Sequence, residues 1–186
     1  MMIRSRPVLV LGALLLALAP VRALQAQVPP APTTPAPAVD TATATAEGTV
    51  LALYQLVSFR AGETTDWAKV RALFLPEAVV VLRTSRTVTN VFSVDGFIHD
   101  FVAFDSIPAV ARGGFTETVV RLRPMVLGNV AHVLVLYEAH VTGSTRPPQQ
   151  GVDSFHLVRR EGRWSIVSIM NEVIEPERPL PAELRP

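Results

Sequence analysis

The chain of 186 residues is long enough for one domain with flanking segments, and its 49% apolar and 18% charged residues are typical of a globular protein. The formal net charge of +1 includes no basic block, which excludes a nucleic-acid partner because phosphate binding needs clustered cations. The chain has no cysteine, which excludes disulfides, thiol chemistry and a lipid-modified cysteine anchor.

The first 26 residues have the parts of a secretory signal peptide. Two arginines lie within Met1–Arg6, and a run of small and aliphatic residues covers Val8–Ala19. This run is shorter than the roughly 20 apolar residues that span a bilayer, so we expect cleavage rather than a permanent anchor. Small residues favour cleavage after Ala23 or Ala26. We therefore expect a periplasmic or secreted mature protein without a membrane span.

Two proline-rich segments flank the predicted domain. Residues 27–47 contain mainly Pro, Ala and Thr. Proline keeps the backbone extended, and these side chains offer little apolar surface to bury, so we expect a disordered linker there. Residues 175–186 are also rich in proline, which cannot continue a strand inside a sheet, and we expect a C-terminal tail. The folded domain is accordingly predicted to cover residues 48–174.

Three helices are predicted in the first half of this domain. Gly62 closes the first, Thr65 or Asp66 caps the second before Pro76 ends it, and Ser93 caps the third. Their apolar stripes at helical spacing are Val50, Leu53, Tyr54 and Val57; Trp67, Val70 and Phe74; and Phe97, Ile98, Phe101 and Phe104.

Strands make up the rest of the domain. Ala78–Leu82 and Thr87–Phe92 predict a hairpin that turns at residues 84–86. Four longer strands follow: Phe115–Val126, Val130–Thr142, Val152–Arg160 and Arg163–Ile174. Short connections make antiparallel neighbours the default. The order predicts an α+β fold in which a cone-shaped, curved antiparallel sheet wraps around three helices and leaves an interior suited to a small molecule.

Two stretches of the chain resemble the nuclear-transport-factor-2-like superfamily, in particular its SnoaL-like and ketosteroid-isomerase-like branch. The first reads LYQLVSFRAGETTDWAKVRALFLPEAVVV and has the family's helix, Gly-containing turn, second helix and apolar strand. The second reads VDSFHLVRREGRWSIVSI and has its paired terminal strands with a Gly-x-Trp hairpin. The resemblance covers Gly48–Ile174 and implies a cystatin-like fold. It does not identify an activity, because the family contains enzymes, binding proteins and structural modules.

The resemblance also implies roles for two residues. In the isomerase branch, a tyrosine on the first helix and a protonated aspartic acid on the penultimate strand hold the substrate oxyanion. Tyr54 and Asp153 match these positions. The general base of that branch has no match, because residues 78–94 contain no Asp or Glu and the nearest positions are Leu82 and Arg83. We therefore do not predict ketosteroid isomerisation, and whether the protein is an enzyme stays open.

Tyr54 and Asp153 also have structural interpretations. A buried tyrosine commonly bonds to the backbone or to water instead of a ligand. An arginine such as Arg83 could pair with Asp153 and make the site structural. Asn171 and Glu172 point to opposite faces of the last strand, and Asn171 is a further candidate ligand contact at the pocket mouth.

Three more candidates lie on the strand at residues 130–142. His132, Glu138 and His140 fall on alternate positions and share one face. We expect this face to be the concave one, so that the three side chains line the pocket; the alternative is that Val133 and Val135 face inward. No metal site is expected here, because a strand places His132 about 20 Å or more from His140.

Two functions from different classes remain open. The first is an exported SnoaL-like domain that binds a small, mostly apolar molecule, with weak isomerase, lyase or hydrolase chemistry around Tyr54 and Asp153. The second is a non-catalytic association module whose core is filled. A cavity of about 300 Å³ or more would favour the first. No cofactor is expected, because the chain has no phosphate loop or nucleotide fingerprint. The exposed sheet face predicts a homodimer.

Overall fold

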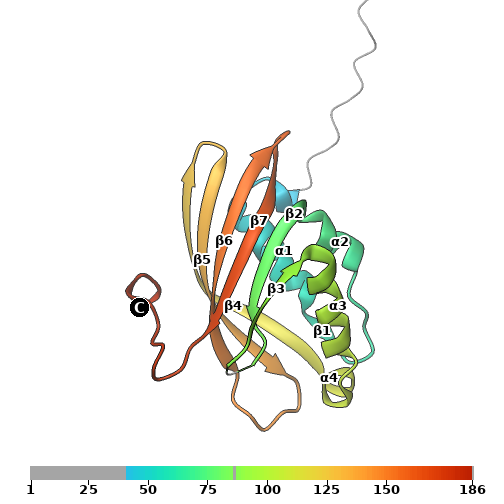
Figure 1. Ribbon diagram of the computed structural model, residues 1–186. Coiled ribbons are helices and arrows are strands. Elements are labelled where there is room, and N and C mark those ends of the chain that lie inside the picture. The colour runs from blue at the N-terminus through green and yellow to red at the C-terminus, as the bar shows by residue number, and fades with distance from the viewer. Residues whose placement is uncertain (1–40, 86, 186) are drawn as a thin grey trace, which may run out of the picture. The chain divides into compact units, whose positions relative to one another are not determined.

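The computed structural model describes residues 41–85 and 87–185, so the predicted signal peptide and most of the predicted linker lie outside the described residues. Helices lie on one side of a curved sheet (Figure 1). The helical elements are the 3-10 helix η1 (Thr41–Thr43), α1 (Ala46–Val57), α2 (Trp67–Ala72), α3 (Val94–Asp105), α4 (Pro108–Gly113) and the 3-10 helix η2 (Ala182–Leu184). The strands are β1 (Phe59–Arg60), β2 (Phe74–Arg83), β3 (Thr89–Ser93), β4 (Gly114–Leu127), β5 (Val130–Val141), β6 (Gln149–Arg160) and β7 (Arg163–Val173).

A side-chain cap starts each of the three predicted helices. Thr45 accepts a hydrogen bond from the Gly48 backbone N–H and starts α1, while Asp66 and Ser93 cap α2 and α3. The caps expected at Asp66 and Ser93 are therefore confirmed. Ordered structure begins before residue 48, because α1 starts at Ala46 and Thr43 is buried. The prediction missed α4, whose Pro108 occupies the first turn, where the lost N–H costs nothing.

The seven strands form one sheet in the order β1-β4-β5-β6-β7-β2-β3. The predicted α+β fold with a curved sheet is confirmed, and the β2–β3 hairpin and the β4–β7 meander are antiparallel. One pairing differs from the expected antiparallel pattern: β2 lies parallel to β7. Loop length predicts only sequence neighbours, whereas this pair joins two strands from opposite ends of the domain.

The second helix is shorter than predicted, because β2 starts at Phe74. Phe74 was expected on that helix, yet α2 ends at Ala72 and Phe74 already pairs with Ile166 of β7. The register then shifts between Phe74 and Val79, and Pro76 lies inside this irregularity. A proline has no N–H to give to a ladder and is tolerated at such a bulge. Pro76 thus interrupts the pairing of a strand and does not terminate a helix.

The core lies between the concave face of the sheet and the helices. Its fully buried members include Val50, Val70, Val80, Val133, Val135, Phe155 and Ile166. None of the helices among residues 41–85 and 87–185 has the length and hydropathy needed to cross a bilayer.

The C-terminal segment folds back over the sheet. Leu184 of η2 is fully buried, and η2 contacts β4 and β5. Arg123 Nε donates to the Glu183 carbonyl at 3.2 Å, and Arg121 donates to the Arg185 carbonyl. Figure 1 shows this segment on the side of the sheet away from the helices. It continues no strand, as expected of a proline-rich sequence, but it covers part of the outer face.

Candidate functional site

An inner cavity of about 510 Å³ lies between the helices and the concave face of the sheet. Aromatic rings supply much of its wall: Phe97, Phe101 and Phe104 from α3, Phe115 from β4 and Phe155 from β6. The phenylalanine stripe predicted for the third helix therefore faces this cavity, where Phe101 contacts Phe97, Phe104 and Phe115 edge to face. The cavity is larger than the 300 Å³ that separates an open pocket from a filled core.

A hydrogen-bonded cluster of four side chains forms one polar part of the wall. The Tyr54 hydroxyl donates to Asp153 Oδ2 at 2.5 Å. Asn171 Nδ2 donates to Asp153 Oδ1 at 2.7 Å and to the Tyr137 hydroxyl oxygen at 2.8 Å. Asp153 and Asn171 are direct cross-strand partners on β6 and β7, which explains their contact. The structure thus brings Tyr54, Asp153 and Asn171 into one cavity.

Among the residues that the structure describes, no arginine forms an ion pair with Asp153. Arg83 Nη2 instead donates to Glu172 Oε2 at 2.7 Å, so the alternative pairing of Asp153 with Arg83 is wrong. Burial raises the pKa of Asp153 to about 6, although the hydrogen bonds from Tyr54 and Asn171 act in the opposite direction. Burial, followed by the charge of Asp153, also raises the pKa of Tyr54 above its usual range.

Glu117 of β4 is a cavity residue that the sequence interpretation missed. It is half-buried, and its backbone N–H donates to Ser58 Oγ at 2.9 Å, which holds this part of β4 against the end of α1. Among the described residues, none forms a hydrogen bond with its carboxyl group. Burial and then the nearby charge of Asp153 raise the pKa of Glu117 to about 8. A carboxyl group is therefore present in the cavity, but on a different strand from the isomerase base.

A sequence signal for Glu117 existed. Phe115, Glu117 and Val119 alternate along a predicted strand and share one face. Phe115 is buried and Val119 packs against the core, which places the carboxylate between two inward residues. An acidic residue on the apolar face of a strand is the pattern that points to a cavity.

Tyr137 presents a second unused polar group. Its hydroxyl oxygen accepts from Asn171, while its own O–H finds no acceptor among the residues that the structure describes. The ring lies against Gly151, the cross-strand partner of Tyr137, where an added Cβ would be 2.3 Å from the hydroxyl oxygen. Gly151 is thus the residue that lets Tyr137 reach Asn171 and the cavity.

The expectation that His132, Glu138 and His140 lie on the concave face of β5 is wrong, because the alternate positions of this strand face inward. His132 bonds to Ser154 Oγ at 2.9 Å and stacks on His156, and Glu138 accepts from Gln150 Nε2 at 2.9 Å. Neither residue lines the inner cavity. The inward positions are instead Ala131, Val133, Val135 and Tyr137, which are all buried. This face is the more apolar of the two, so burying it against the helices is favoured.

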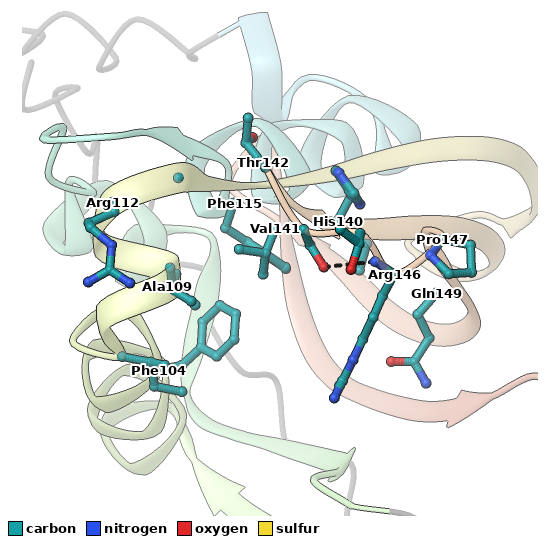
Figure 2. Close-up of a pocket in the computed structure, with 17 residues that line it drawn as sticks. Phe104, Ala109, Arg112, Phe115, His140, Val141, Thr142, Arg146, Pro147 and Gln149 are labelled. Atoms are coloured by element: carbon teal, nitrogen blue, oxygen red, sulfur yellow. Dashed lines mark hydrogen bonds between the residues drawn. The ribbon is translucent and has the colours of Figure 1, made fainter.

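His140 does line a cavity, but a second, outer one of about 890 Å³ (Figure 2). This outer cavity is formed by α4, the end of β5 and the loop before β6. It shares wall residues with the inner cavity: Phe104, Ile107, Phe115, Ala139 and Gln149. The two cavities are therefore adjacent compartments with a common wall. Within residues 41–85 and 87–185, no group of three or more metal-binding side chains converges.

Comparisons with solved structures agree with this architecture. An NTF2-like protein of unknown function from Pseudomonas putida is 11% identical with a TM-score of 0.55, over 75% of this chain and 93% of that one. A protein with a cystatin-like fold from Caulobacter vibrioides is 14% identical with a TM-score of 0.54, over 70% and 88%. A structure described as a putative scytalone dehydratase, from Novosphingobium aromaticivorans, is 12% identical with a TM-score of 0.52, over 69% and 81%. At these identities the likeness shows the fold alone.

No curated protein matches the sequence. The sequence model of one family, described as "Putative lumazine-binding", matches residues 46–171, which span α1 to β7 and include Tyr54, Glu117, Tyr137 and Asp153. The chain therefore belongs to this lumazine-binding-like family, and its fold is that of the NTF2-like proteins.

Proposed function

We propose that this domain binds a small, mostly apolar molecule in the inner cavity. The observation that carries the proposal is an aromatic cavity of about 510 Å³ in which the Tyr137 O–H has no acceptor and the Glu117 carboxyl has no hydrogen-bond partner among the described residues. Buried polar groups normally find hydrogen-bond partners, and a ligand would supply them. A filled association module offers no reason to keep such groups beside an open cavity.

The contacts also restrict what the ligand offers. Its body packs against phenylalanine rings, which favours a planar or ring-containing molecule. Near Asn171 it presents an oxygen or nitrogen that accepts the Tyr137 O–H. Tyr54 is not available in the same way, because its hydroxyl already donates to Asp153. The polar contact that Tyr54 was expected to make is therefore assigned to Tyr137.

The relatives support ligand binding as a class. The family description refers to lumazine, a fused-ring compound, and one neighbour of similar fold is described as a dehydratase. Both descriptions concern other proteins, and each names a small molecule as ligand or substrate. The aromatic wall seen in this chain is compatible with a fused-ring body.

Native mass spectrometry of the protein purified from its natural source tests the proposal. We expect a co-purified small molecule in the wild type and its loss in Ala103→Trp, because Ala103 is an exposed cavity residue on α3 where an indole would block the space. Ala68→Trp on the exposed side of α2 is the matched control and should retain the ligand. A wild-type protein without any ligand, which also fails to bind apolar dyes, would contradict the proposal.

A second, finer proposal is proton-transfer chemistry. Its support is Glu117, whose carboxyl lies in the cavity without a hydrogen-bond partner in the described part of the chain and whose pKa of about 8 suits an acid or base near neutral pH. The co-purified ligand incubated with the protein in D₂O should gain deuterium at carbon. Glu117→Gln should still bind the ligand but lose the exchange, whereas exchange that persists in this variant would exclude Glu117 as the base.

A further inference from the structure

The outer cavity differs from the inner one in charge. Arg112 of α4 and Arg146 of the loop between β5 and β6 line the outer cavity together with His140. None of its wall residues is acidic. The carboxyl groups of the two compartments, on Asp100, Glu117 and Asp153, all belong to the inner cavity.

Both outer arginines are without an acidic partner in the described part of the chain. Neither Arg112 nor Arg146 forms an ion pair there, although arginines elsewhere do, as Arg83 does with Glu172. The arginine of the inner cavity is thus already neutralised by a carboxylate, whereas the two outer ones are not. Figure 2 shows Arg112 on one side of the outer cavity and Arg146, beside Gln149, on the other.

The two compartments share part of their walls. Phe104, Ile107, Phe115 and Ala139 face both cavities, and Gln149 does so beside Arg146. A molecule whose apolar body lies among the phenylalanine rings therefore has a neighbouring compartment, lined by the two arginines, for an acidic group. Guanidinium groups recognise carboxylate, sulfonate and phosphate oxygens in the same way, through forked N–H donors.

We propose that the ligand is an amphipathic anion, with its apolar body in the inner cavity and its acidic group held at the outer cavity by Arg112 and Arg146. This inference rests on the proposed function and specifies the ligand class of the same site. It places the acidic group of the ligand in the outer cavity. Neither the fold nor the family description assigns a role to that cavity. His140 adds a third nitrogen group that can donate to the same oxygens.

Two dyes that share an aromatic body provide the test. 1-Anilinonaphthalene-8-sulfonate carries an anionic group, and N-phenyl-1-naphthylamine has the same rings without it. Both become fluorescent in apolar cavities, so their dissociation constants can be compared on the purified domain. We expect Arg112→Gln/Arg146→Gln to weaken the sulfonate dye about threefold to tenfold, the size of one or two exposed ion pairs, and to leave the neutral dye within twofold of wild type.

The controls separate charge from position. Arg60→Gln/Arg160→Gln removes the same charge from exposed arginines outside both cavities and should leave both dyes unchanged. Ala103→Trp should weaken both dyes, which locates them in the inner cavity. Added salt should weaken the sulfonate dye in wild type and have little effect on it in the Arg112→Gln/Arg146→Gln variant.

Each outcome decides between the two proposals. If the neutral dye binds and the dissociation constant of the sulfonate dye is the same for wild type and for Arg112→Gln/Arg146→Gln, the anionic-ligand inference is wrong. The cavity proposal then stands. If the control pair of arginines has the same effect, long-range charge and not the outer cavity is responsible, and the inference is again wrong. If neither dye binds, the proposed function fails and this inference fails with it.

Discussion

At the residue scale, the carboxyl groups of Asp153 and Glu117 define the chemistry of the inner cavity. Asp153 is hydrogen-bonded by Tyr54 and Asn171, whereas the Glu117 carboxyl has no such partner among the described residues. Burial raises the pKa of both, but the bonds to Asp153 favour its ionised form, so its pKa rises less. At neutral pH this order predicts an ionised Asp153 beside a largely protonated Glu117. This order does not favour, at pH 7, the neutral Asp153 that an oxyanion donor requires.

Carboxyl-detected NMR titration checks this order of ionisation. We expect midpoints of about 6 for Asp153 and about 8 for Glu117, because burial disfavours both charges. In Glu117→Gln the midpoint at the higher pH should be absent, which would assign that midpoint to Glu117. A midpoint for Asp153 below the unperturbed value of about 3.9 would mean a cation partner and would contradict the structure.

The same shift gives a pH dependence of stability. The pKa of Glu117 is raised in the folded state. Its contribution to the free energy of unfolding is therefore fully present below the unfolded-state pKa near 4.5 and is lost as the pH rises through about 8. Glu117→Gln cannot ionise and avoids this loss. Its melting temperature should match wild type at pH 5 and exceed it by roughly 2–8 °C at pH 9. Equal differences at both pH values would argue against a buried, titrating Glu117.

At the element scale, the pairing of β5 with β6 sets the position of the polar cluster. Tyr137 lies directly opposite Gly151, and Val135 opposite Asp153. The phenol ring can therefore lie flat over the glycine backbone while its hydroxyl reaches Asn171. This arrangement depends on strand register, since a slip by one residue would turn Asp153 to the outer face.

Gly151→Ala tests this element. The added methyl group would overlap the Tyr137 ring, so we expect a loss of about 1–3 kcal/mol in the free energy of unfolding, measured by urea denaturation. Combining it with Tyr137→Leu should make the loss smaller than the sum of the two single losses. Gly96→Ala on α3 is the control, because its Cβ meets only ordinary contacts at 3.5 Å and should be neutral or stabilising. Equal effects at both glycines would contradict the proposed packing.

At the scale of the whole molecule, the outer face of the sheet is only partly covered. The C-terminal segment buries Leu184 against β4 and β5, but Met170 on β7 is 53% exposed and Leu127 at the end of β4 is 80% exposed. Exposed apolar side chains of this size favour association. A homodimer through the uncovered part of the face therefore stays a prediction, and export after cleavage of the first 23 to 26 residues does as well.

Light scattering at micromolar concentration tests the dimer. We expect twice the mass of the mature chain for wild type. Met170→Glu should give the monomer mass, because an exposed charge at this position opposes burial without disturbing the core. Val102→Glu, at an exposed apolar position of α3 and not on the sheet, is the control and should keep the dimer mass. A wild type that is monomeric at these concentrations would overturn the prediction.

The sequence by itself determined the local elements. The caps at Asp66 and Ser93, the stripes of α1 and α3 and the four long strands depend on neighbours within a few residues, and they are found where the pattern predicts them. These features follow from short-range geometry. The match of Tyr54 with Asp153 came from the family resemblance, and the inward direction of both side chains agrees with it.

Tertiary structure decided everything that depends on which surfaces meet. The parallel contact of β2 with β7, the inward face of β5 and the return of the C-terminal segment all join parts of the chain that are distant in sequence. The placement of Glu117 in the cavity follows from the same contacts, since its strand face becomes an interior only when the helices pack on it. A strand pattern has two faces, and only packing on the helices decides which of them is removed from water.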